Sequence, residues 1–245
     1  MNETIEILMA HKTIRKFTDK PINRNTLKTL IKAGQAAASS SFLQAVSIIR
    51  VQDMSIRNQL AAVTGNQDQV KTAPEFLVFC ADLNRPIKSC KSQGSIPKKG
   101  FTEQFIIATV DTALYAQNIV IAAESLDLGI CYIGALRNDP VKTSTVLRLP
   151  ENVYPVFGLC IGYPAENPEV KPRLPLSVVF KENCYDVSNE DDELENYDML
   201  LQNYYTQRSG NKKSQNWSEQ MASILKKEAR PHMRKFLEKQ GFKMK

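Results

Sequence analysis

Residues 101–129 read FTEQFIIATVDTALYAQNIVIAAESLDLG, the longest stretch of the chain with the character of a single helix. A bilayer-spanning helix needs about 20 mostly apolar residues, so this stretch is long enough to cross a membrane. Asp111, Gln117, Asn118 and Glu124 spread polar groups around it, however, and such groups are costly inside lipid. We therefore predict a buried central helix of a soluble protein, with a subunit interface as one possible setting.

Shorter apolar runs before and after this helix predict strands. They are VSIIRV (46–51), FLVFCAD (76–82), ICYIGAL (130–136) and YPVFGLCIGYP (154–164). The nearly continuous run at 76–82 is typical of a strand that is covered on both faces. Helical patterns occupy 3–10, a segment opened by Asn23, 55–63, 139–147 and stretches after 190, including 216–228. Strands that alternate with helices predict an α/β or α+β fold.

The composition excludes several classes of chemistry. The chain has 245 residues, of which 42% are hydrophobic and 24% charged, as in an ordinary soluble globular protein. Two histidines cannot supply a His-rich metal site. Five cysteines without a C-x-x-C pair argue against a zinc ribbon, a thioredoxin-like motif or a secreted disulfide framework. We expect reduced thiols, no metal site and a cytoplasmic location, since MNETIEILMAHK at the start has no signal-peptide core.

The common nucleotide and hydrolase motifs are missing from the sequence. It contains no G-x-G-x-x-G after a predicted strand, no G-x-x-x-x-G-K-[ST] and no G-x-S-x-G. Two histidines also make a Ser-His-Asp triad improbable. If the chain is an enzyme, we therefore expect a cofactor to carry the chemistry.

The net charge of +6 is concentrated near the C-terminus. Residues 206–245 carry a net charge of +8, whereas residues 1–205 carry −2 and include the acidic run EDDELENYD at 190–198. Two interpretations stay open: a solvated tail, or an arm that binds an anion such as nucleic acid or a phosphorylated small molecule.

Three local features suit an anionic or flat ligand. The segment 11–15 combines His11, Lys12, Thr13 and Arg15, and a second segment places Lys171 and Arg173 around a proline. Arginine offers a planar fork, lysine a point charge and threonine a neutral donor to a phosphate. At the end of the third predicted strand, Gly134 would let the backbone approach a ring. Taken alone, the segment 11–15 is better explained as a basic cluster on the surface, and Gly134 is equally well explained as a turn glycine.

Together the motifs resemble the flavin-dependent nitroreductase superfamily, and specifically its NADPH-preferring branch. The resemblance covers nearly the whole chain. It is carried by HKTIRKFTDKPI, ASSSFLQAVSIIRV, TGNQ, EFLVFCADLNR, AQNIVIAAESLDLGICYIGALRN, FGLCIGYPAENPEVKPRLP, YY…R and the tail W…KKEARP.

The resemblance implies an α+β sandwich with a central mixed sheet and helices on both faces. It further implies a homodimer that holds one FMN at each subunit interface. Residues 1–189 would form the FMN-binding core, and 190–245 an extended helical arm that wraps the dimer and contacts NADPH.

The resemblance also assigns site residues. Contacts to the FMN phosphate and ribityl chain fall on His11, Lys12, Thr13, Arg15, Ser39, Lys171 and Arg173. The isoalloxazine edge would meet Gln67 and the strand end Tyr132, Ile133, Gly134, Ala135, Leu136 and Arg137. The 2′-phosphate of NADPH would lie on Arg208 and Lys213, or the adjacent Lys212, with Arg230 nearby. Arg15, Ser41 and Phe42 would lie on the substrate side.

The expected activity is that of an FMN-dependent NADPH oxidoreductase with a ping-pong mechanism. Its acceptors would be nitroaromatics, quinones or free flavin, and no protein side chain need act as a catalytic acid or base. We expect neither nucleic acid nor a membrane as a partner. Two alternatives stay open: a nucleic-acid-binding protein that uses the basic tail, and a flavin-carrying binding or donor protein with weak turnover.

Overall fold

The chain divides into two compact units. The computed structural model describes residues 2–188, 190–210 and 212–245. The first unit joins the chain up to Glu166 with 230–245, and the second unit is 167–229. The sequence places the boundary between core and arm at 189/190. The structure groups 167–188 with the arm instead, and it returns residues 230–245 to the core.

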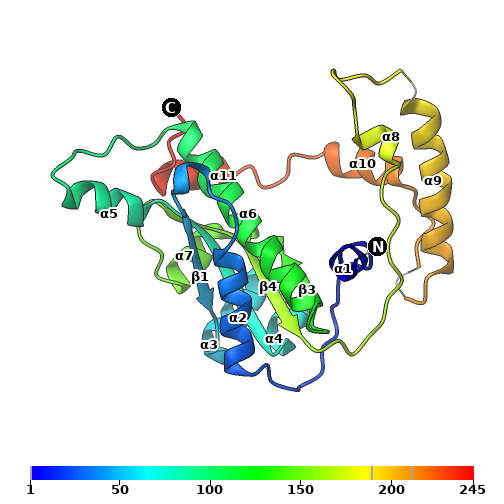
Figure 1. Cartoon of the computed structure of the whole chain (residues 1–245), viewed down its shortest axis with the longest axis horizontal. Coiled ribbons are helices and arrows are strands. Elements are labelled where there is room, and N and C mark those ends of the chain that lie inside the picture. The colour runs from blue at the N-terminus through cyan, green and yellow to red at the C-terminus, as the bar shows by residue number, and fades with distance from the viewer. Residues whose placement is uncertain (1, 189, 211) are drawn as a thin grey trace. The chain divides into compact units, whose positions relative to one another are not determined.

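The first unit contains a four-stranded sheet and most of the helices (Figure 1). Its strands are β1 (Val46–Arg50), β2 (Glu75–Asp82), β3 (Gly129–Ile133) and β4 (Val153–Gly162). Its α-helices are α1 (Glu3–Met9), α2 (Arg24–Gln35), α3 (Met54–Val63), α4 (Asp68–Thr72), α5 (Asn84–Ser92), α6 (Thr102–Glu124), α7 (Pro140–Val146) and α11 (Met233–Lys239). Two 3₁₀ turns are η1 (Ser40–Phe42) and η2 (Gly134–Asn138).

The sheet has the order β1-β2-β4-β3, and each of these pairs is antiparallel. The α+β class is therefore confirmed. The resemblance implied a sheet that mixes parallel and antiparallel pairs, but among the described residues parallel pairing is confined to an isolated bridge between Thr13 and Ile130. This bridge places the segment around Thr13 along the outer edge of β3.

Both faces of the sheet are covered, as the apolar run in β2 predicts. Successive side chains of a strand point to opposite faces. Accordingly, Leu77 and Phe79 join the core cluster formed with α2 and α6. Phe76 and Val78 join the cluster on the other face, with α3 and η2. All four side chains are at most 1% exposed.

Helix α6 is shorter and less buried than the sequence predicts. It ends at Glu124, because Asp127 turns the chain with φ of 57° and Gly129 already belongs to β3. A Cβ at Gly129 would lie 2.6 Å from Ile14, so glycine is needed where the segment 11–15 crosses β3. By length and composition alone, α6 could cross a membrane.

One face of α6 lies in the core against α2 and the sheet, through residues such as Ala116, Ile119 and Val120. The opposite face exposes Ile106, Val110 and Leu114 by 42–49%. The predicted central helix is thus buried on one side only.

Residues 230–245 complete a third core cluster of the first unit. Phe236, Leu237 and Phe242 pack there with Tyr154 of β4, and each is at most 5% exposed. The backbone amide of Asn152 also donates to the carbonyl of Gln240.

The second unit contains α8 (Leu176–Val179), α9 (Glu190–Gln207) and α10 (Trp217–Leu225). Tyr197, Leu201 and Tyr205 of α9 form its small core, against which Leu174 and Trp217 pack. Residues 171–175 form no regular element, as their two prolines predict.

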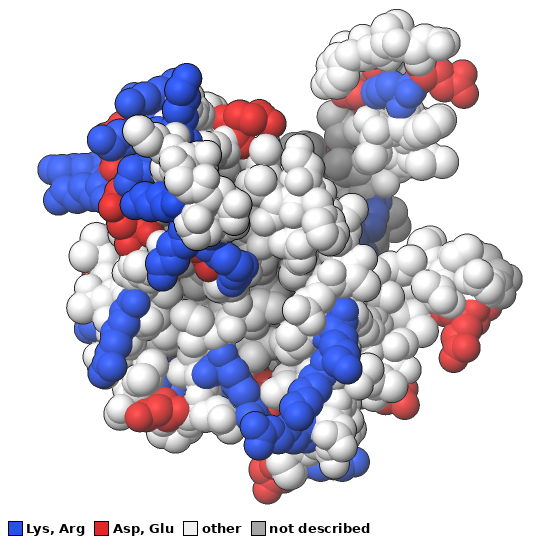
Figure 2. Space-filling model, turned by 60° about the vertical axis from the view of Figure 1, so that its left-hand side comes forward, with Lys and Arg blue, Asp and Glu red and all other residues white. Residues whose placement is uncertain are grey.

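Positive charge gathers on particular elements of the first unit. Helix α2 carries Arg24, Lys28 and Lys32, and α5 carries Arg85, Lys88 and Lys91; neither helix contains an acidic residue. Figure 2 shows many basic side chains on the face of the molecule that this view presents. The slightly negative sum over residues 1–205 therefore conceals local basic surfaces.

Candidate functional site

The basic segment 11–16 is fixed along β3 by two carboxylates. The amide of Ile14 donates to the carbonyl of Ile130 at 2.9 Å. The Nδ1 atom of His11 lies 2.6 Å from Glu124 Oε1 at the end of α6. The amides of Arg15 and Lys16 donate to Glu166 Oε1 at 2.6 and 3.1 Å. The backbone is thus held by hydrogen bonds, while the Arg15 side chain is exposed.

Gln67 reaches the same strand from the turn before α4. Its Nε2 donates to the carbonyl of Thr64 at 3.1 Å, and its Oε1 accepts from Gln69 Nε2 at 2.7 Å. Gln69 Nε2 in turn lies 3.9 Å from Cys131 Sγ. Burial raises the pKa of the Cys131 thiol, and the positive charge of Arg15 opposes part of that rise. The segment 11–16, Gln67 and β3 therefore form one group.

The strand end 132–137 presents its predicted residues unevenly. Ile133 and Leu136 are at most 1% exposed, so almost nothing of either residue is accessible to a ligand in a single copy of the chain. Tyr132 is 37% exposed and packs edge-on against Phe157, with ring centroids 5.0 Å apart. Burial, with a smaller contribution from Glu124, raises the pKa of Tyr132 to about 12, so its hydroxyl stays neutral.

Gly134 begins the turn η2 after β3. The nearest atom to a Cβ built there is Arg137 Nη2 at 3.4 Å, and the residue has no positive φ. Neither packing nor backbone conformation within this chain demands a glycine at this position. A flat ligand lying against the turn would demand one.

The C-terminal segment is tied to the same turn. Arg137 donates from Nη1 to the carbonyl of Val156, and its own carbonyl lies 2.9 Å from His232 Nε2. Arg230 donates from Nε to Asn138 Oδ1 at 3.0 Å. Burial, and then the charge of Arg230, lowers the pKa of Arg137. Arg230 is therefore placed beside the strand end that the sequence assigns to the ring.

Ser39, Ser41 and Phe42 lie away from this group. The Ser39 hydroxyl donates to Asp111 Oδ2 at 2.7 Å, whereas His11 pairs with Glu124 on the same helix. Thirteen residues of α-helix separate the two carboxylates, which is about 20 Å. One copy of the chain thus does not bring both sets of predicted residues together.

The second unit gathers three predicted cations around one ring. Arg208, Lys171 and Lys213 lie 4.6, 5.2 and 6.0 Å from the ring centroid of Tyr205. Burial would raise the pKa of Tyr205, but hydrogen bonds with Lys171 and Gln220 and the charges of Lys171 and Arg208 outweigh it and lower that pKa. The sequence assigned Lys171 to FMN and Arg208 and Lys213 to NADPH; the structure brings all three together.

Two further contacts shape this cation group. Tyr197 donates from its hydroxyl to the carbonyl of Pro172 at 3.0 Å, which fixes the proline between Lys171 and Arg173. Glu169 accepts from the amide of Ser209 at 3.1 Å. Backbone hydrogen bonds, with a smaller contribution from Arg208, lower the pKa of Glu169.

Several residues that hold the site were not identified from the sequence. Glu124, Glu166 and Tyr205 all position predicted cations. All three lie within the quoted motifs, but the sequence assigned a role to none of them. In the described parts of the chain, no group of three or more His, Cys, Asp or Glu side chains is arranged to hold a metal ion.

Comparisons with known proteins cover nearly the whole chain. Residues 8–163 match the model of the "Nitroreductase family", and 171–245 match that of the "Nitroreductase family, C-terminal domain". The chain is 47% identical to an NADPH-flavin oxidoreductase of Vibrio harveyi over 98% of both chains. It is 44% identical to an oxygen-insensitive NADPH nitroreductase of Salmonella typhimurium over 99% of both chains. A solved structure of the NADPH:FMN oxidoreductase from Vibrio harveyi complexed with NAD+ matches with a TM-score of 0.91 and 44% identity, covering all of both chains.

Proposed function

The chain belongs to the nitroreductase family, and on that basis we propose that it is an FMN-dependent NADPH oxidoreductase. The observation that carries the proposal is similarity over the full chain to NADPH-flavin and NADPH nitro reductases. The acceptors would be small molecules, namely nitroaromatics, quinones or free flavin. Neither the comparisons nor the described residues favour the alternatives of a nucleic-acid-binding or weakly active flavin-carrying protein.

The residues beside β3 fit FMN. Lys12, Thr13 and Arg15 supply donors of three kinds to a phosphate. The open position at Gly134 suits the flat ring. FMN, when bound, accepts a hydride from NADPH and passes two electrons to an acceptor.

The chain's own contribution is binding, orientation and electrostatics. Gln67 is held by Thr64 and Gln69, so its side chain has a fixed orientation beside β3. Gly134 and Ala135, which are partly exposed, would offer backbone groups to the ring edge. Cations such as Arg15 near the ring would stabilise negative charge that develops during reduction.

We place the coenzyme on the cations of the second unit. Arg208 and Lys213 would hold the 2′-phosphate of NADPH. The supporting observation is that Tyr205 gathers Arg208, Lys213 and Lys171 within 6.0 Å of one ring centroid. Such a concentration of positive charge attracts a phosphate.

A homodimer would complete the site. Ser39, Ser41 and Phe42 of one copy lie about 20 Å along α6 from the His11 group of the same copy, so a second copy would have to supply them. The exposed residues Ile106, Val110 and Leu114 offer an apolar surface for that contact. Beside them is a cavity of about 560 Å³ that Tyr132 and Phe157 line.

A dimer of this kind accounts for the exposed face of α6 without a membrane. We propose a cytoplasmic enzyme with neither nucleic acid nor a membrane as a partner. Its five cysteines are free, and Cys80, Cys131 and Cys160 are buried.

The direct test is to purify the protein and follow its flavin absorbance in stopped flow under anaerobic conditions. We expect a yellow protein that NADPH bleaches within seconds, and colour that returns when a quinone is added. NADH should bleach it more slowly. A colourless protein, or a yellow one that neither coenzyme bleaches, would contradict the proposal.

A further inference from the structure

A buried carboxylate in the middle of α6 holds the loop that connects α2 to β1. Asp111 is 1% exposed. Its Oδ2 accepts from the Ser39 hydroxyl at 2.7 Å and from the Ala45 amide at 3.0 Å, and its Oδ1 lies 3.4 Å from the Ser40 amide. One side chain thus closes both ends of the loop 39–45. An ionised carboxylate is suited to this role because it only accepts hydrogen bonds.

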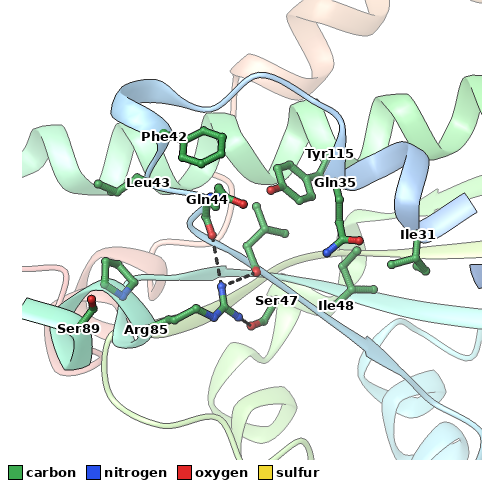
Figure 3. Close-up of a pocket in the computed structure, with 12 residues that line it drawn as sticks. Ile31, Gln35, Phe42, Leu43, Gln44, Ser47, Ile48, Arg85, Ser89 and Tyr115 are labelled. Carbon is green, nitrogen blue, oxygen red and sulfur yellow. Dashed lines mark hydrogen bonds between the residues drawn. The ribbon is translucent and has the colours of Figure 1, made fainter. Parts of the chain in front are cut away.

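Arg85 of α5 holds the same loop from the other side. Its Nη1 donates to the carbonyls of Gln44 and Val46 at 3.3 and 3.2 Å, and its Nη2 donates to the Ser47 hydroxyl at 2.9 Å. Figure 3 shows Arg85 reaching these groups across the pocket from Phe42. The loop is therefore held by a carboxylate at its two ends and by a guanidinium near its exit into β1.

The conformation that these contacts impose is unfavourable for the loop itself. Ser41, Phe42 and Gln44 have φ values of 49°, 55° and 51°, which side chains other than glycine seldom adopt. The result is a Phe42 side chain that is 79% exposed. Burying the carboxyl group of Asp111 and holding three residues at positive φ in order to expose a phenyl ring does not stabilise the fold. Strain of this kind clusters at functional sites.

The exposed ring borders a cavity of about 790 Å³. Tyr115, one helical turn after Asp111, also lines this cavity, together with Gln35 and Ile48 (Figure 3). Aromatic rings prefer offset-stacked or edge-to-face neighbours, so a phenyl ring that projects from a held loop backbone favours planar ligands over compact ones.

We propose that Asp111 is a positioning residue that fixes Phe42 and thereby gives the enzyme its preference for planar aromatic acceptors. Asp111 touches neither acceptor nor cofactor and acts through the loop 39–45. The inference rests on the proposed function, because it concerns the acceptor side of the same site. Asparagine at this position would offer one acceptor oxygen in place of two and would turn an amide toward the donors of the loop.

The test is a double-mutant cycle on the FMN-loaded enzyme with Asp111→Asn, Phe42→Ala and the double variant. The readout is kcat/KM for a benzoquinone divided by kcat/KM for hexacyanoferrate(III), an acceptor without a ring. We expect Asp111→Asn to lower this ratio about tenfold. The same substitution should leave the ratio unchanged in the Phe42→Ala background, because the two residues act as one unit.

Asn118→Ala is the matched control. It also removes a polar side chain of α6, but one that donates to the carbonyl of Ala33 in α2 rather than to the loop. Its ratio should equal that of the wild type. If Asp111→Asn does not fold, Arg85→Ala replaces it, since that side chain is 58% exposed and its loss should lower the ratio about threefold.

An unchanged ratio in the folded Asp111→Asn variant would overturn the proposal, and so would an equal change with and without Phe42. An unchanged ratio in Arg85→Ala would do the same where that variant takes its place. Bleaching of the wild-type flavin by NADPH distinguishes failure of the proposed function from failure of the role proposed for Asp111. If the wild type is not bleached, the proposed function fails; if it is bleached and the ratio stays flat, only the role of Asp111 fails.

Discussion

The two groups of cations in this chain are held by different chemistry. In the first unit, carboxylates fix the segment 11–16: Glu124 pairs with His11, and Glu166 accepts from the amides of Arg15 and Lys16. In the second unit, the Tyr205 ring gathers three cations. A carboxylate neutralises a cation that it pairs with, whereas an aromatic face attracts a cation and leaves its charge in place.

The difference indicates two ways to prepare a phosphate site. In the first unit the acids hold mainly the backbone, so the backbone is fixed and the Arg15 side chain projects from it. In the second unit the cations themselves are gathered, with Glu169 as an acidic neighbour. We therefore expect the first group to control flavin retention and the second to control the choice of coenzyme.

Replacing Arg15 should have the largest effect. Arg15→Ala removes the planar fork that we assign to the FMN phosphate, and we expect the Kd for FMN to rise more than tenfold. The purified variant should lose most of its yellow colour, measured as flavin absorbance per subunit. Lys16→Ala is the control, because this neighbour is also exposed and its amide uses the same Glu166 oxygen. If the Arg15→Ala variant keeps the full flavin absorbance of the wild type, Arg15 does not bind the FMN phosphate.

Replacing Arg208 should alter one coenzyme only. A hydrogen bond to a charged group is worth about 1.5–3 kcal/mol, so Arg208→Ala should raise KM for NADPH about ten- to a hundredfold. KM for NADH should stay nearly constant, because NADH lacks the 2′-phosphate. Lys226→Ala, in the same basic arm, should change neither value. Equal effects of Arg208→Ala on both coenzymes would contradict the assignment of coenzyme choice to the cations of the second unit.

Replacing Tyr205 examines the ring as a support for the cations. Tyr205→Leu should raise KM for NADPH about three- to tenfold, in line with the strength of several cation–π contacts. Tyr205→Phe keeps the ring and should have a smaller effect. Because Tyr205 is only 4% exposed, circular dichroism should accompany both measurements. Equal KM values in the two variants would assign the effect to the hydroxyl group instead.

Replacing Glu166 should have the smallest effect. Glu166→Gln keeps an oxygen that can accept from the amides of Arg15 and Lys16, so the Kd for FMN should stay within about twofold. Glu166→Ala removes the acceptor and should raise the Kd about threefold. Fluorescence titration of the apoprotein with FMN measures both. If the Gln variant is as impaired as the Ala variant, the charge of Glu166 matters more than its hydrogen bonds.

Sequence patterns predicted the elements that bury continuous apolar runs. Strand β2 is buried along its whole length, as FLVFCAD indicated. Helix α5 was not predicted, because Ile87 and Cys90 are too few to mark an apolar stripe in NRPIKSCKS and the helix fully buries no residue. The end of α6 was misplaced because the apolar pattern continues past Glu124, whereas the chain turns at Asp127 and Gly129 pairs in β3.

Residue types identified the candidate ligand-binding side chains, but not the residues that contact them in the folded chain. Arg208 and Lys213 were predicted by resemblance to relatives. Their shared neighbour Tyr205, and the proximity of Lys171, depend on the folding of the second unit. Asp111 is similar: the sequence shows an acid in an apolar helix, and only the fold shows that its partners are Ser39 and Ala45.

The return of residues 230–245 to the first unit affects the order in which the protein matures during synthesis. Domains usually fold as units while the chain is being made, beginning from the N-terminus. Here the third core cluster needs Phe236, Leu237 and Phe242, which follow the whole second unit. The second unit can therefore be finished before the first, and the part of the chain that is made earliest must wait for almost the last residues before its third core cluster is complete.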